Sequence, residues 1–312
     1  MDRPEQPYQR TITQLLASVT FSEGHRPLLT CYDDITGART ELSYATLDNW
    51  AAKTANMLVE EYYVGAGGTV HMDLDGHWTT AVLTLACWKV GAVPLPRPNR
   101  SAAGPAAALV CCHERHVDRY PDGPLLVVGD GLAAEPLTDV PPRRGLTLLG
   151  EEVHAFADDY EGEVEPSTPA LIPTRRLADA RPHPDFPTRR LADARPHPDF
   201  PTRRLADARP HPGGAVDHAA VLMWAAAWRA VLGDNARVGL AAPLDHPRAP
   251  DLFAGVLLAR GSLVADRPPA HPPRWDRWSG EHVTIVVGPA EAIAAAPSSV
   301  EVVSFDSVPV GA

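Results

Sequence analysis

Apolar residues recur first at helical and then at extended spacing along most of this chain. The clearest helix is predicted over residues 78–90, where Val82 and Leu85 follow the spacing of one helix face. Gly91 ends this helix, since glycine is common just beyond a helix C-terminus. An extended apolar run begins two residues later, at Val93. The pattern therefore predicts a helix that passes directly into a buried strand.

Strands and helices are predicted in alternation on both sides of a proline-rich block at residues 173–212. Ser43 and Asp217 each precede a predicted helix and are suited to cap it, because their side-chain oxygens accept hydrogen bonds from the first turn. Alternation with glycine-rich turns is typical of parallel sheets joined by right-handed crossovers, so we predict an α/β protein with largely parallel sheets. The predicted helices are at 11–19, 44–62, 78–90, 219–232, 252–259 and 290–296, and the predicted strands at 27–32, 39–43, 69–74, 106–110, 125–128, 237–242, 262–265, 283–287 and 300–305.

The proline-rich block is a tandem repeat. The sequence PTRRLADARPHPDF occupies 173–186 and again 187–200, and its first twelve residues recur at 201–212. Each copy offers one leucine and at most one phenylalanine for burial, so packing cannot offset the entropy lost on ordering. We predict that the block is a disordered insert between a first α/β unit at 1–165 and a second at 213–312. Its nine arginines suit it to bind an acidic partner or RNA, but loop insertions are well tolerated, and we favour a neutral repeat expansion.

Composition argues against several classes of protein. The formal net charge of −11 opposes nucleic-acid binding over a broad surface, because phosphate binding needs a positive field. No apolar run approaches the roughly 18 residues of a membrane-spanning helix, and the polar start MDRPEQPYQR does not resemble a signal peptide. The four cysteines show no CxxC spacing, which favours free thiols in a reducing compartment. We therefore expect a cytoplasmic protein that binds neither membrane nor nucleic acid.

Two stretches resemble known signature motifs. LSYATLD at 42–48 and HWTTAVLTLACWKVGAVP at 77–94 are similar to the first two signatures of the acyl-adenylate-forming enzymes, the superfamily of acyl-CoA synthetases, luciferases and peptide-synthetase adenylation domains. The resemblance implies the family's N-terminal domain with two flavodoxin-like parallel-sheet subdomains, here of the short actinobacterial kind. Weaker matches follow in the family's order: TPALI at 168–172, GAVDH at 214–218, APLDH at 242–246, VTIVVGP at 283–289 and the strand at 302–309.

The chain departs from this family where adenylation chemistry is expected. Active members hold the ATP phosphates with a Thr/Ser/Gly-rich loop followed by a lysine, and here the proline-rich repeat, which lacks many of the N–H groups such a loop supplies, takes that place. The sequence also ends before the family's adenine motif and lysine-bearing C-terminal domain, and its two lysines, Lys53 and Lys89, fall in predicted helices of the first unit. We therefore expect a truncated, non-catalytic relative with no catalytic residue and no cofactor, ATP and Mg²⁺ being needed only if the chain is active.

A ligand site is nevertheless expected between the two units. Gly213 and Gly214 precede a helix and are suited to an anion-binding nest. Asp245 and His246 follow a predicted strand, and a histidine there is suited to line a pocket or to act as a base. The residues predicted to bind the ligand are Gly213, Gly214, His218, Asp245, His246 and Gly288.

One further cluster, His113-Glu114-Arg115-His116, has the short spacing of metal ligands. Residues 108–112 fit a buried strand better, with the histidines exposed at its end. We therefore predict no metal site.

Three functions are compatible with the sequence. We favour binding of a small acyl or nucleotide-like ligand, or of a protein partner, without catalysis. The first alternative is an ATP-dependent acyl-activating ligase completed by another chain. The second is an interaction protein that acts through the arginine-rich repeat.

Overall fold

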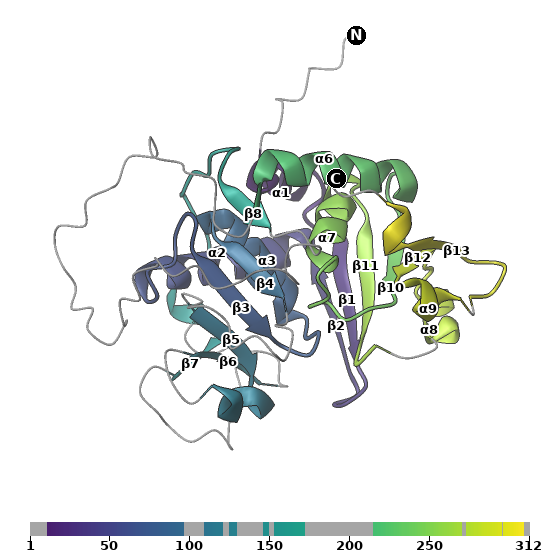
Figure 1. The fold of residues 1–312 in the computed structure, drawn as a ribbon, viewed down its shortest axis with the longest axis horizontal. Coiled ribbons are helices and arrows are strands. Elements are labelled where there is room, and N and C mark those ends of the chain that lie inside the picture. The colour runs from purple at the N-terminus through teal and green to yellow at the C-terminus, as the bar shows by residue number, and fades with distance from the viewer. Residues whose placement is uncertain are drawn as a thin grey trace, which may run out of the picture.

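The computed structural model describes residues 11–96, 109–120, 125–129, 146–149, 153–171, 215–269, 273–294 and 296–308. These residues form two sheets of mainly parallel strands, sheet A and sheet B, with helices on their faces (Figure 1). The predicted α/β class with parallel sheets is confirmed. The repeat block at 173–212 lies outside the described residues, so its predicted disorder stays a prediction.

Sheet A combines strands from both ends of the chain. Strand β1 pairs in parallel with β11, from Leu29 opposite Leu263 to Asp33 opposite Arg267, and β2 forms an antiparallel edge beside β1. Sheet pairing thus crosses the boundary expected between the two units, because an apolar pattern indicates a strand without naming its partner. The strands are, in spatial order, β13 (Glu301–Ser304), β12 (Ile285–Gly288), β10 (Arg237–Leu240), β11 (Ser262–Arg267), β1 (Pro27–Asp33) and β2 (Ala38–Ser43).

Sheet B is entirely parallel and comes from the N-terminal half of the chain. β3 lies between β4 and β5, so the chain leaves β3 toward one side and returns on the other. The strand predicted at 106–110 is found three residues later, as β5. The strands are, in spatial order, β4 (Val93–Pro96), β3 (Thr69–Asp73), β5 (Leu109–His113), β6 (Leu125–Val128) and β7 (Leu146–Leu148).

Helices α2 (Tyr44–Glu60) and α3 (Thr79–Val90) lie between the two sheets (Figure 1). Leu47 of α2 and Leu85 of α3 pack in the core of sheet A, whereas Met57 of α2 packs in the core of sheet B. α3 is buried on almost all sides, as expected of a helix whose apolar residues are not confined to one face. This burial explains why the stretch stands out in the sequence.

The remaining helices cover the other faces of the sheets. α1, α6 and α7 pack on the face of sheet A that also contacts α2 and α3, and α8 and α9 cover the opposite face. α8 is not predicted from the sequence, because it is too short to establish a helical period. These elements are α1 (Ile12–Glu23), α6 (His218–Leu232), α7 (Ala249–Leu258), α8 (Trp275–Gly280) and α9 (Ala290–Ile293), with 3-10 helices η1 (Glu114–Arg119), η2 (Val153–Ala155) and η5 (Phe305–Ser307).

The helix ends predicted at Ser43, Gly91 and Asp217 are confirmed. The Ser43 hydroxyl accepts a hydrogen bond from the N–H of Thr46, and the Asp217 carboxylate accepts one from Ala220. Gly91 follows α3 with φ 72°, a left-handed conformation that glycine adopts without strain. Among the described residues, none of the helices combines the length and the apolar character required to cross a membrane.

A short antiparallel pair, β8 (Pro169–Leu171) and β9 (Val216–Asp217), completes the fold. Leu171 lies opposite Val216, and β8 lies beside β4 and α6. The described chain therefore stops before the repeat block and resumes after it on neighbouring strands.

Candidate functional site

The carboxyl ends of β10 and β12 form a topological switch point in sheet A. The chain leaves β10 through α7, on one face of the sheet, and leaves β12 through α9, on the opposite face. Open parallel sheets bind ligands in the crevice beside such diverging connections. The loop after β10 carries Asp245 and His246, and β12 ends at Gly288. Three of the predicted site residues therefore lie at this edge.

The two strand ends approach each other closely. The N–H of Ala241 donates to the carbonyl of Val287 at 2.8 Å. A Cβ at Gly288 would lie 2.8 Å from the Cβ of Ala241, closer than real side chains come. This backbone approach by itself accounts for glycine at position 288.

His246 is held in one orientation at this edge. Its ring stacks on Phe305 with 4.7 Å between centroids and 8° between planes. Its Nδ1 accepts a hydrogen bond from the N–H of Arg248 at 3.1 Å. Burial, with the nearby charge of Arg248, lowers the pKa of His246 to about 4. The imidazole is therefore neutral at pH 7 and carries its proton on Nε2, which suits it to donate a hydrogen bond to a ligand.

A buried charged network supports the edge, and sequence reasoning missed it. Asp251 is 1% exposed, accepts the Trp228 Nε1–H at 2.8 Å and pairs with Arg248 at 3.0 Å. Arg248 also donates to the carbonyls of Phe305 and Val308. The network joins α6 and α7 to the segment after β13. The only sequence signal is the three-residue spacing of Arg248 and Asp251 at the start of α7.

His218 lies at the first residue of α6 rather than at the strand ends. It is fully buried, and its Nδ1 accepts the N–H of Ile12 at the start of α1, at 3.3 Å. Burial lowers its pKa to about 4. These contacts join α6 to α1. Gly213 and Gly214, predicted to form a nest beside it, lie outside the described residues.

Both lysines of the sequence are held by contacts within the N-terminal half. Lys89 lies 2.7 Å from a carboxylate oxygen of Asp48, and Lys53 donates to the carbonyl of Phe156 at 3.0 Å. Each cation therefore has a structural partner.

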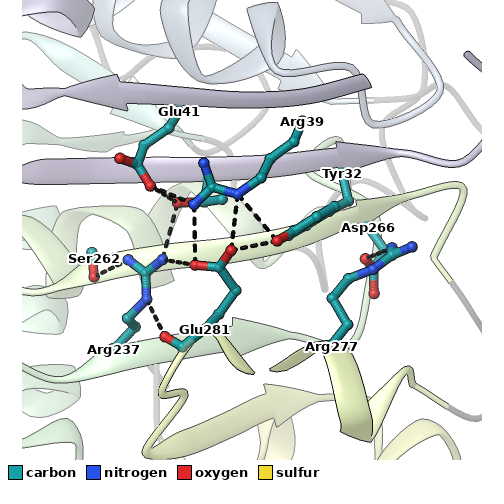
Figure 2. Close-up of polar contacts among 9 residues, drawn as sticks. Tyr32, Arg39, Glu41, Arg237, Ser262, Asp266, Arg277 and Glu281 are labelled. Atoms are coloured by element: carbon teal, nitrogen blue, oxygen red, sulfur yellow. Dashed lines mark hydrogen bonds and ion pairs between the residues drawn. The ribbon is translucent and has the colours of Figure 1, made fainter. Parts of the chain in front are cut away.

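A second charged network lies on the face of sheet A that α8 covers (Figure 2). Glu281, directly after α8, accepts hydrogen bonds from Tyr32, Arg39 and Arg237. Burial alone would raise the pKa of Glu281, but these donors lower it to about 2. Arg39 also contacts Glu41 on the same strand. Because the charges satisfy one another, the network fastens the β1–β2 hairpin to α8.

Part of the chain is similar to a known protein sequence. No family model matches the chain. A stretch of 66 residues is 48% identical to a "TIGR03089 family protein" of Mycobacterium tuberculosis (strain ATCC 25618 / H37Rv). The match covers 21% of this chain and 27% of that relative, so it spans only about a quarter of the relative's length.

Solved structures match nearly the whole chain. A putative long-chain-fatty-acid CoA ligase from Rhodopseudomonas palustris CGA009 superimposes with a TM-score of 0.65 and 15% identity, over 95% of this chain and 70% of that one. The N-terminal domain of FACL13 from Mycobacterium tuberculosis superimposes with a TM-score of 0.62 and 16% identity, over 97% of this chain and 68% of that one. An acyl-CoA synthetase from Brucella canis superimposes with a TM-score of 0.60 and 17% identity, over 93% of this chain and 50% of that one. The chain therefore spans half of that enzyme.

The chain therefore has the fold of the N-terminal domain of acyl-CoA synthetases. The resemblance to the acyl-adenylate-forming enzymes is confirmed in this respect, and at such low identities the likeness establishes the fold alone.

Proposed function

We propose that this protein binds a small acyl or nucleotide-like ligand at the carboxyl edge of sheet A and does not itself form an acyl-adenylate. The observation that carries the proposal is the switch point between β10 and β12, where the loop carrying Asp245 and His246 lies beside Gly288. Matched structures named as long-chain-fatty-acid CoA ligases favour acyl chemistry for the ligand.

The side chains at this edge suit an acyl ligand. Leu244 and Phe305 are apolar and almost fully buried, as the wall of an acyl site would be. The neutral imidazole of His246 offers an N–H to a carboxylate or carbonyl oxygen.

The absence of catalysis is argued from the residues that adenylation needs. Between β8 and β9, where the family places its phosphate loop, this sequence has the proline-rich repeat. Lys53 and Lys89 are both engaged in structural contacts. A second polypeptide that supplied the missing groups would make the chain part of an active ligase.

The test is a calorimetric titration of the purified protein with octanoate, palmitate and AMP, and with ATP and Mg²⁺, alongside pyrophosphate exchange with the same acids. We expect saturable binding of an acid or of AMP and no exchange. His246→Ala should weaken binding about tenfold, the value of one lost hydrogen bond. His25→Ala is the matched control, because His25 is exposed in the connection between α1 and β1.

ATP-dependent exchange would overturn the non-catalytic part of the proposal. No binding of any probe, or equal binding by the two histidine variants, would overturn the assignment of the site.

A further inference from the structure

A cluster of carboxylates and an imidazole lies at the corresponding edge of sheet B. Asp73 ends β3, Asp75 follows it, and His116 lies in η1 after β5. One ligand atom from each of the three lies within 4.8 Å of the others. The expected exposure of the histidines after β5 is wrong, since His113 is 0% and His116 5% exposed. η1 brings His116 against Asp73 at the end of β3.

The cluster lies at the switch point of sheet B. β3 leads into α3, which packs on the face toward sheet A, and β5 leads into η1 on the outer face. The rule for ligands at open parallel sheets applies here as well. The loop after β3 also meets the loop after β10, since a Cβ at Gly76 would lie 3.2 Å from both the Leu244 nitrogen and the Pro243 Cβ.

His116 directs both ring nitrogens toward carboxylates. Nδ1 lies 3.1 Å from the main-chain carbonyl of Asp73 and 3.2 Å from its carboxylate, so Nδ1 carries a proton. Nε2 lies 2.9 Å from Oδ2 of Asp75. On a neutral ring this would set the Nε2 lone pair against a carboxylate lone pair. A metal ion bound by both atoms would satisfy the Nε2 and Oδ2 lone pairs together.

The geometry suits a metal ion. Two ligand atoms bound at right angles about 2.1 Å from an ion are about 3 Å apart, close to the Nε2–Oδ2 separation. Donation from the other ring nitrogen to a carbonyl or carboxylate is the usual way in which a metal-binding histidine is oriented.

The surroundings leave one side of the cluster open. Arg119 and the Tyr120 hydroxyl fix the Asp73 carboxylate, at 2.9 and 3.0 Å. The Asp75 side chain is 30% exposed, which gives an ion access from solvent.

We propose that Asp75 and His116 bind a divalent transition-metal ion of the Zn²⁺ type, with Asp73 orienting the imidazole through Nδ1 and water in the remaining coordination positions. Imidazole together with carboxylates favours such ions over Mg²⁺. The site reverses the expectation from sequence that there is none, and it does not depend on the proposed ligand site in sheet A.

Calorimetric titration of the untagged full-length protein with Zn²⁺ tests the proposal. We expect one strong site per chain. Asp75→Asn keeps the shape of a partly exposed side chain and should weaken binding at least tenfold. Asp118→Asn makes the same charge change on an exposed residue of η1 and should leave binding unaltered. Circular dichroism establishes that both variants are folded.

Co²⁺ in place of Zn²⁺ identifies the ligand type by absorption. Bands of nitrogen and oxygen coordination are expected, and a thiolate charge-transfer band would overturn the proposal. Absence of strong Zn²⁺ binding would overturn the proposal. Equal binding by the Asp75 and Asp118 variants would assign the ion to other histidines, such as His183, His197 and His211 of the repeats, and would also overturn it.

Discussion

Burial holds several imidazoles of this protein neutral. The pKa values of His218 and His246 are lowered to about 4, and burial also lowers that of His71. His218 and His246 each use Nδ1 to accept a backbone hydrogen bond, which a second proton on the ring would abolish. Protonation of these two residues is therefore opposed by burial and by their bonds.

We expect the free energy of unfolding to fall as the pH drops from about 6.5 to 4. An unfolded histidine titrates near 6.5, so in this window the unfolded chain binds more protons than the folded one, and acid favours unfolding. For His218 alone the loss is about 3 kcal/mol near pH 4. His218→Gln keeps an acceptor for the Ile12 N–H and should flatten this dependence. Urea unfolding over a pH series measures it, and equal slopes in both proteins would contradict the prediction.

The sequence identifies single site residues better than it identifies which residues are in contact. Asp245, His246 and Gly288 follow predicted strands, and their place at a sheet edge is predictable because parallel strands share a carboxyl edge. The contact between Asp75 and His116 is not predictable, because it requires knowing that β3 and β5 are neighbours. The buried Arg248 and Asp251 pair was missed for a similar reason.

Helices α6 and α7 pack closely against each other at Gly255. A Cβ at Gly255 would lie 2.2 Å from the Cβ of Trp228. A side chain at this position would push the two helices apart. That movement would also lengthen the hydrogen bond between Trp228 and Asp251.

Gly255→Ala should therefore destabilise the protein by about 1–3 kcal/mol, although alanine is the better helix former. Gly280→Ala is the control, because a Cβ there meets nothing within 4 Å. Thermal unfolding of the two variants measures the difference. If both behave like the parent, the helices are not packed as tightly as the structure indicates.

The type of an element can be predicted from the sequence where its periodic apolar pattern extends over many residues. α2, α3 and α6 are predicted within a few residues of their observed bounds. α8 escapes notice because it is short and its two tryptophans, Trp275 and Trp278, do not complete a periodic pattern. Strand pairing is not predicted for a different reason. β1 and β11 are far apart in the chain, and neither sequence indicates that the other is its partner.

For the whole molecule, the shared sheet joins the two halves of the chain. β1 and β2 precede the repeat block, and β10 to β13 follow it. The core of sheet A likewise draws on α1, α2 and α3 from one half and on α6 and α7 from the other. Neither half retains a complete sheet A.

Two co-expressed fragments, residues 1–172 and 213–312, should therefore associate and copurify through a tag on one of them. Each fragment alone should lack a cooperative unfolding transition, because its share of the sheet A core would be exposed to water. Circular dichroism with thermal melting checks this. Fragments that fold separately and do not bind each other would contradict the prediction.

The pairing of β8 with β9 sets the distance that the repeat block spans. Neighbouring strands are about 5 Å apart, and Leu171 and Val216 lie opposite each other across this gap. Gaining or losing a fourteen-residue copy changes the length of the chain but not this gap. Closing a loop twice as long costs only about 0.6 kcal/mol more. Slippage during DNA replication can therefore alter copy number with little consequence for the folded protein, and natural alleles should differ in the number of copies they carry.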